Sequence, residues 1–132
     1  MADDRKTYLV PGYPAPPSFL STAIVSGGFI YCSGALPVTP DGKMVEGTFG
    51  DRVTAVLDNL EAVLKAHGSG LEHTVKALIF ITDYANFDEL NRVYTPRMPT
   101  PAPARSCIGA AKLPRGSDIE IELVALAPRA KL

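Results

Sequence analysis

The sequence of 132 residues is poor in cysteine, has no excess of either charge and contains no long hydrophobic run. Its two cysteines, together with an opening MADDRKTYLV that does not resemble a secretory signal, predict free thiols in a reducing, cytoplasmic compartment. The net charge of −1 argues against a nucleic-acid partner or an acidic membrane. The longest apolar runs, such as ALIFI, are far too short to cross a bilayer. These features favour a small cytoplasmic enzyme or binding protein.

The pattern of apolar residues predicts a single α+β domain over residues 1–132. It indicates a hairpin around Ser26, Gly27 and Gly28, a helix over 51–67 capped by Asp51, and a further helix over 87–94. TVKALIFITDY is expected to be a strand buried on both faces, and two more strands end the chain. Two helices cover only one face of such a sheet. Because the last strands are apolar on both sides, the other face is expected to meet another copy.

The final stretch, PARSCIGAAKLPRGSDIEIELVALAP, places charged residues in both predicted strands. Strand side chains alternate, so Arg105 and Cys107 share one face and Ile108 takes the other. Ile108 fits a helix-covered core, which would turn Arg105 toward the subunit contact. If these two strands pair through the LPRGSD turn, Arg105 and a glutamate of the last strand, Glu120 or Glu122, can lie on the same side of the sheet.

Two interpretations of this pair remain open from the residues alone. In the first, the guanidinium fork of Arg105 binds a small carboxylate and a partly desolvated glutamate holds a water. In the second, Arg105 and a glutamate form a salt bridge on a wet or interfacial sheet face.

The segment from Pro103 to Ile121 closely resembles the signature of the Rid family, also called YjgF proteins, the reactive intermediate imine/enamine deaminases. The matching features are the Ala-Arg-Ser run, Ile108, Leu113 and the Ile-Glu-Ile run that ends at Ile121. The resemblance extends over nearly the whole chain, through FIYCSGALPVTPDGKMV, NLEAVLKAHGSGLEHTVKALIFITD and FDELNRVY.

This resemblance implies a chorismate-mutase-like fold, a mixed sheet with two helices on one face, and a barrel-like homotrimer with sites between subunits. It implies that Arg105 binds the substrate carboxylate, that Glu120 positions water or moves a proton, and that Cys107 lines the pocket and offers its backbone N–H. Ser33 and Gly34 would form the opposite wall. The implied reaction is the hydrolysis of 2-imino acids and their enamine tautomers to 2-keto acids and ammonia, without cofactor or metal.

Two positions depart from the family pattern. Leu20, with Phe19 beside it, occupies the place where many deaminase members carry a tyrosine, and Gly109 replaces a frequent glutamate. Both changes make the predicted pocket less polar. They favour a bulkier or more apolar substrate, or a non-catalytic member that binds small carboxylates and acts through a protein partner. Tyr13 and Tyr84 are possible sources of the missing hydroxyl.

The remaining reactive side chains carry weaker signals. His67 and His73 lack the ligand spacing of a metal site and are expected at the surface. Cys32 is expected in the core, whereas Cys107 is either an inert pocket wall or a thiolate favoured by Arg105. Ribonuclease activity, an older association of the family, is disfavoured because the chain has no Lys/Arg stripe and no aromatic ladder.

Overall fold

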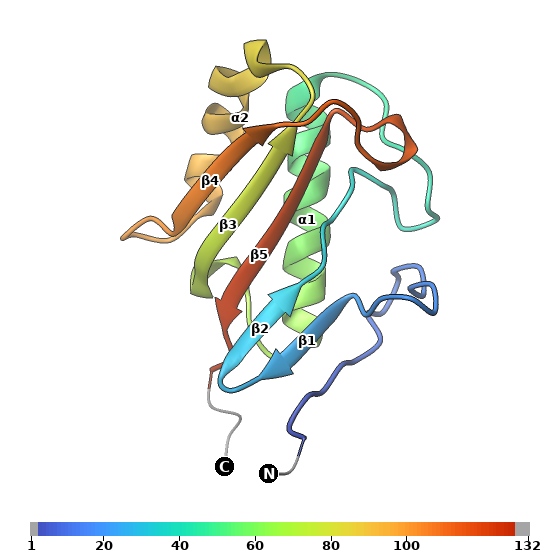
Figure 1. The fold of residues 1–132 in the computed structure, drawn as a ribbon, viewed down its shortest axis with the longest axis vertical. Coiled ribbons are helices and arrows are strands. Elements are labelled where there is room, and N and C mark those ends of the chain that lie inside the picture. The colour runs from blue at the N-terminus through green and yellow to red at the C-terminus, as the bar shows by residue number, and fades with distance from the viewer. Residues whose placement is uncertain (1–2, 129–132) are drawn as a thin grey trace.

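The computed structural model describes residues 3–128 as a mixed five-stranded sheet with two helices on one face (Figure 1). The helices are α1 (Phe49–Ala66) and α2 (Phe87–Tyr94). The sheet order is β1-β2-β5-β3-β4, and only β3 and β4 run parallel. The strands are β1 (Ala23–Ser26), β2 (Phe29–Cys32), β3 (Thr74–Ile81), β4 (Ala104–Gly109) and β5 (Ile119–Leu126). The predicted α+β class and the predicted order of elements are confirmed.

Local sequence signals explain the ends of the elements. Gly27 and Gly28 both have positive φ, as the tight turn between β1 and β2 requires. The cap of α1 differs from the prediction: Thr48 is the N-cap, and Asp51 lies three residues into the helix. The two close a capping box, since the Asp51 N–H donates to the Thr48 hydroxyl and the Thr48 N–H donates to the Asp51 carboxylate.

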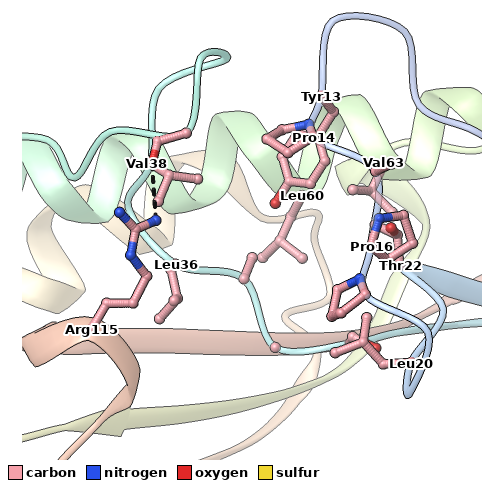
Figure 2. Close-up of a pocket in the computed structure, with 16 residues that line it drawn as sticks. Tyr13, Pro14, Pro16, Leu20, Thr22, Leu36, Val38, Leu60, Val63 and Arg115 are labelled. Carbon is pink, nitrogen blue, oxygen red and sulfur yellow. Dashed lines mark hydrogen bonds between the residues drawn. The ribbon is translucent and has the colours of Figure 1, made fainter.

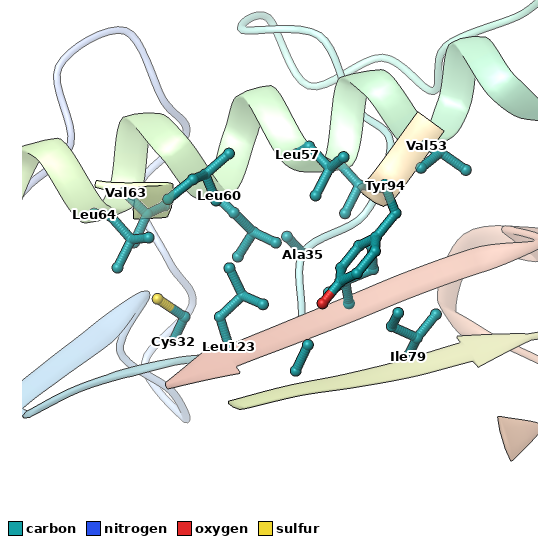
Figure 3. Close-up of a cluster of buried hydrophobic side chains, with 14 of the residues drawn as sticks. Cys32, Ala35, Val53, Leu57, Leu60, Val63, Leu64, Ile79, Tyr94 and Leu123 are labelled. Atoms are coloured by element: carbon teal, nitrogen blue, oxygen red, sulfur yellow. The ribbon is translucent and has the colours of Figure 1, made fainter. Parts of the chain in front are cut away.

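The core lies between the two helices and one face of the sheet (Figure 3). On β3, Ala77, Ile79 and Ile81 are fully buried on that face, whereas Leu78 and Phe80 on the opposite face are only half-buried. The prediction that β3 is buried on both faces is therefore wrong for a single chain. The side chains that α1 contributes are Val53, Val56, Leu57, Leu60, Val63 and Leu64.

Within residues 3–128, no helix lies over the other face of the sheet. Its large apolar side chains are substantially exposed, among them Tyr31 at 49%, Ile108 at 47% and Leu126 at 43%. Half-buried Glu120 and Glu122 lie on the same face. An apolar sheet face of this kind is typical of a subunit contact.

The predicted pairing of the last two strands is wrong, because β3 lies between β4 and β5. The chain passes from β3 through α2 to β4 as a parallel crossover, and then crosses the end of β3 to reach its other edge. The Ala110 N–H donates to the Ile81 carbonyl on one side of this end, and the Thr82 N–H donates to the Asp118 carbonyl on the other. A local turn pattern does not distinguish this path from a hairpin.

The predicted facing of Arg105 is also wrong. Arg105 pairs with Ala77 and Cys107 pairs with Ile79, so both side chains lie on the helix-covered face. Phe80 pairs with both Ile108 and Glu120, which places these three on the uncovered face. An arginine is tolerated on the helix side because β4 is the edge strand, where the core is open to solvent.

Candidate functional site

Arg105 is held against the aromatic side of α2. Its Cζ atom lies 5.0 Å from the ring centroid of Tyr94 and 5.6 Å from that of Phe87, both within cation–π range. Within residues 3–128, Arg105 forms neither an ion pair nor a side-chain hydrogen bond. The second interpretation given above, a salt bridge between Arg105 and a glutamate, is therefore not realised within residues 3–128 of a single chain. The guanidinium is oriented, yet its five N–H donors are free for an anion.

The outer edge of β4 presents backbone groups next to this guanidinium. The Ala110 N–H donates to β3, and in a parallel pair of strands every second residue bonds to the same neighbour. Arg105 and Cys107 are the residues in between, so their backbone N–H and C=O groups point away from β3. The Tyr84 hydroxyl donates to the Cys107 carbonyl over 3.1 Å, which agrees with this direction. The N–H and C=O of one strand residue point to the same edge, so the Cys107 N–H also faces outward.

Tyr84 covers the side of β4 that Gly109 leaves open. Its ring stacks on that of Phe87, with centroids 5.1 Å apart and planes at 11°. A Cβ atom built on Gly109 would lie 3.9 Å from Tyr84 Cδ1, in ordinary contact. Desolvation first, and then the neighbouring Cys107, raise the pKa of Tyr84, so its hydroxyl remains a donor. Tyr84 is one of the two tyrosines considered as sources of the missing hydroxyl, and it lies beside β4, the strand that carries Arg105.

Glu120 occupies a second position, across the sheet, against Gly34. A Cβ atom built on Gly34 would lie 2.8 Å from both Cδ and Oε1 of Glu120, so the carboxylate fills space that only glycine leaves. Two backbone hydrogen bonds between Ala35 and Ile121 fix this register. Burial, and to a lesser extent the charge of Glu122, raise the pKa of Glu120.

Ser33, Gly34 and Leu20 line one cavity of about 370 Å³ (Figure 2). The Ser33 hydroxyl donates to the Ser21 carbonyl over 2.6 Å, which anchors the wall. Phe19 does not line the cavity and is 84% exposed. Tyr13, the other tyrosine considered above, lines the same cavity. The structure therefore brings together Leu20, Ser33 and Gly34 but leaves Phe19 outside.

The predicted site residues form two groups that one chain does not join. Arg105 and Cys107 lie on β4 with side chains on the helix-covered face, whereas Glu120 lies on the uncovered face of β5 with β3 between them. Of Arg105, Cys107 and Glu120, only Glu120 lies against Gly34 in the cavity wall.

Sequence reasoning missed the two aromatic residues that orient Arg105. Phe87 and Tyr94 are seven residues apart in the predicted helix, a spacing that places them on one face, and this signal was sufficient to find them. His67 contradicts its predicted surface position, since it is only 6% exposed. Its Nε2 accepts from the Tyr8 N–H and its Nδ1 donates to the Val63 carbonyl.

Other expected features can be placed directly. Cys32 is buried as predicted, and burial raises the pKa of its thiol to about 12. Across residues 3–128, no three His, Cys, Asp or Glu side chains are grouped so that they could hold a metal ion. None of the helices in that range is long and apolar enough to span a membrane.

The fold and the oriented guanidinium define a small α+β protein with an arginine held by two aromatic rings at the edge of its sheet. Residues 13–127 match the model of the family described as Endoribonuclease L-PSP. The chain belongs to this family, which is the Rid or YjgF family named above.

Two relatives show the range of names within the family. "Protein HMF1" of Saccharomyces cerevisiae is 43% identical over 112 residues, covering 85% of this chain and 87% of that protein. "Reactive Intermediate Deaminase A, chloroplastic" of Arabidopsis thaliana is 37% identical over 113 residues, covering 85% of this chain and 60% of that protein. Since one relative is named chloroplastic, the cytoplasmic location of this chain stays a prediction.

Two solved structures share the fold. The yeast structure "YEO7_yeast" has a TM-score of 0.89 at 39% identity and covers 94% of this chain and 99% of its own. The structure of E. coli TdcF with bound serine has a TM-score of 0.85 at 28% identity and covers 93% and 99%. The chorismate-mutase-like fold implied by the sequence is confirmed.

Proposed function

We propose that this protein is a homotrimeric imine/enamine deaminase that hydrolyses reactive 2-imino acids to 2-keto acids and ammonia. The observation that carries the proposal is Arg105, whose guanidinium is oriented by two aromatic rings and has no anionic partner within residues 3–128. Beside it, the outward-facing N–H of Cys107 supplies one more donor. Such an arrangement suits a small carboxylate, which accepts two parallel hydrogen bonds from a guanidinium.

The complete site would form between two copies of the chain. One copy supplies Arg105 and Cys107 from the free edge of β4, and the next supplies Glu120, Gly34 and Ser33. The uncovered apolar sheet face, with Tyr31 and Leu126 exposed, supports assembly of this kind. It also explains why Arg105 and Glu120 are separated in the single chain.

The reaction requires little beyond orientation and one proton carrier. With the carboxylate on Arg105, the protonated C=N carbon is electrophilic, and Glu120 takes a proton from the attacking water to give a carbinolamine. Glu120 then returns this proton to the nitrogen. The C–N bond breaks, its electron pair leaves with ammonia, and the Glu120 carboxylate takes the hydroxyl proton as the keto group forms. A raised pKa fits Glu120 to both steps.

The relatives support the acid-binding part most directly. TdcF was solved with serine, a small carboxylate, and the Arabidopsis relative is named a deaminase. A second function, binding of small carboxylates without turnover, is favoured by Leu20 and Gly109, which bring no polar group to the site. In that case the protein would act through a partner.

Turnover separates the two functions. The 2-imino acids are generated in situ by an amino-acid oxidase, and release of ammonia and 2-keto acid is followed for the wild type, Arg105→Ala and Arg92→Ala. Arg92 is the control because it lies on exposed α2 surface, paired with Glu89. The deaminase predicts rapid release that only Arg105→Ala loses. Release at the spontaneous rate from a folded protein would instead indicate the binding function.

A further inference from the structure

The cavity of about 370 Å³ lies between α1, the proline-rich segment before β1 and the loop after β2 (Figure 2). Small-molecule sites typically occupy about 300–1,000 Å³. Leu60 and Val63 of α1 line the cavity, so it lies on the helix-covered side of the sheet. Gly34 also lines it, and the Glu120 carboxyl group lies against Gly34 from the uncovered face. The cavity is therefore a space separate from the proposed reaction centre.

The two loops that enclose this cavity are held in place without a ligand. Three of the four residues 14–17 are prolines that line the cavity, and proline has a fixed φ. A Cβ atom built on Gly42 would lie 3.9 Å from Pro14 Cγ, so the two loops meet over the cavity. The Asn59 amide on α1 donates to the Val38 carbonyl over 2.9 Å and fixes the second loop. The cavity is therefore preformed, which lowers the cost of ordering on binding.

Two hydroxyl groups in the cavity lining have no partner. Tyr13 and Thr22 are half-buried, and within residues 3–128 neither hydroxyl forms a hydrogen bond. Figure 2 shows the Tyr13 hydroxyl pointing into the cavity, toward Leu60. Burial, and to a lesser extent the neighbouring Cys32, raise the pKa of Tyr13, so its hydroxyl stays a donor. Polar groups in a largely apolar cavity favour a ligand that supplies their hydrogen-bond partners.

A guanidinium group lies at one end of the cavity. Arg115 is the only charged residue among the described residues that line it, and its Nη1 donates to the Gly42 carbonyl over 2.9 Å. Within residues 3–128, its Nε and Nη2 groups have no partner, and they can donate two parallel hydrogen bonds to a carboxylate. Arg115 also has a φ of 59°, in the left-handed region that residues with a Cβ seldom adopt. Backbone strain of this kind is typical of residues that hold a ligand.

We propose that this cavity is a second ligand site, which binds a small acid with an aromatic body and a hydroxyl group at its far end. The carboxylate would bind to Arg115, and the aromatic ring would pack on Leu60. The hydroxyl group would bond with Tyr13 and Thr22. These binding groups differ from those of the proposed deaminase, so the inference does not depend on that function. Assembly through the uncovered sheet face would leave this side of the subunit open to the ligand.

The probe for this site is 3-(4-hydroxyphenyl)propanoate, which carries a carboxylate and a hydroxyl group at opposite ends of an aromatic ring. Its binding is measured by calorimetry on the Arg105→Ala variant, so that the proposed 2-keto acid site does not contribute. One probe molecule should bind per chain. Two matched ligands each lack one end of the probe: 3-(4-hydroxyphenyl)propan-1-ol lacks the carboxylate, and 3-phenylpropanoate lacks the hydroxyl group.

Removal of the guanidinium tests the carboxylate end. In the Arg105→Ala background, Arg115→Gln should weaken probe binding about 10- to 100-fold, because it removes charge-assisted hydrogen bonds. The affinity for the alcohol should stay unchanged. Lys112→Gln is the matched control, since it removes the same charge from the same segment but Lys112 does not line this cavity. Equal losses in the two variants would indicate unspecific charge attraction and would overturn the inference.

Removal of the two hydroxyl groups tests the other end. Tyr13→Phe and Thr22→Val keep the shapes of the side chains, and each should weaken probe binding roughly three- to tenfold. The affinity for 3-phenylpropanoate, which has no hydroxyl group, should stay near its starting value. Two variants are used so that one remains informative if the other does not fold. If neither variant discriminates between the two acids, the proposed orientation of the ligand is overturned.

Filling the cavity tests its location. Ala15→Phe adds a ring to the cavity from the proline-rich segment and should abolish probe binding. Ser18→Phe is the control, because it adds the same ring in the same segment at a position that does not line the cavity, and it should retain binding. Probe binding that persists in Ala15→Phe would overturn the inference. Absence of binding to the folded Arg105→Ala variant at millimolar probe would overturn it as well, since any acid bound by the wild type would then use Arg105.

Discussion

The two halves of the proposed site are held by opposite means. At the β4 edge, Arg105 is fixed by side chains that are present, the rings of Phe87 and Tyr94. At the other half, Gly34 has no side chain, and the carboxyl group of Glu120 occupies the space that this leaves. In the proposed site, the first half positions the positive charge that binds the acid, and the second half positions the carboxyl group that transfers a proton. Changes at the β4 edge should therefore alter acid binding, and changes at the Gly34 wall should alter turnover.

The largest effect that would sharpen this contrast is expected from Glu120→Gln. Loss of a general base lowers turnover by about 10²- to 10⁴-fold. The 2-keto acid affinity should change little, because Arg105 supplies the binding. Stopped-flow or coupled assays of kcat, with calorimetry of the keto acid, measure both quantities.

Glu122→Gln is the matched control, since Glu122 lies two residues along the same strand and on the same face. It should retain turnover but shift the acidic limb of the pH profile to lower pH, because the charge of Glu122 raises the pKa of Glu120. An equal loss of kcat in the two variants would contradict the role of Glu120.

Glu120 also predicts a pH dependence of stability. Its pKa is higher in the folded chain than in the unfolded chain, so the folded state binds the proton more tightly and the free energy of unfolding falls as pH rises through this window. Glu120→Gln should therefore be more stable than the wild type at neutral pH. It should lose this advantage well below the ordinary pKa of 4.5, as denaturant titrations at the two pH values would show.

The next largest effect is expected from Arg105→Lys, which keeps the charge and removes the planar fork. The lysine cannot reproduce two parallel charge-assisted hydrogen bonds, so 2-keto acid affinity should fall roughly 10- to 100-fold. Circular dichroism should be unchanged, because Arg105 forms no ion pair within residues 3–128. Unaltered affinity would show that the acid binds elsewhere.

A smaller effect is expected from Gly34→Ala. The new methyl group would displace the carboxyl end of Glu120, and a displacement of this kind should lower kcat about tenfold while affinity stays near the wild-type value. In a Glu120→Gln background the same change should cause no further loss. A full additional loss there would show that Gly34 acts independently of Glu120.

The smallest effect is expected from Phe87→Leu, which keeps apolar volume beneath Arg105 but removes one aromatic face. Keto-acid affinity should fall roughly two- to fivefold, the size of an exposed cation–π contact. Tyr84→Phe is the control: it keeps the ring stacked on Phe87 and removes only the bond to the Cys107 carbonyl. If kcat falls in Phe87→Leu while affinity does not, the contrast between the two halves is wrong.

Local signals predicted most of the fold. The hairpin at Gly27 and Gly28, the helix before Gly68 and the helix over 87–94 follow from turn residues and apolar spacing, which act within a few residues. The pairing of β4 and β5 did not follow, because the crossover through α2 sets the position of β4 beside β3. The LPRGSD segment carries no sign of that longer path.

The sequence identified the candidate site residues, but it did not predict on which face of the sheet each of them lies. Ile108 is apolar and was assigned to the core, yet it lies on the uncovered face, where a further copy rather than a helix would bury it. Arg105 was consequently assigned to the wrong face. Hydrophobicity alone does not tell a side chain that packs on a helix from one that packs on another subunit.

The central claim is that Arg105 of one copy and Glu120 of another form one site. It is tested most directly by mixing the inactive variants Arg105→Ala and Glu120→Gln, unfolding and refolding them together, and measuring ammonia release. Random assembly of trimers would place both wild-type residues in about one quarter of the sites, so about one quarter of the wild-type activity should return. No recovery from a mixture that has reassembled would contradict the shared site.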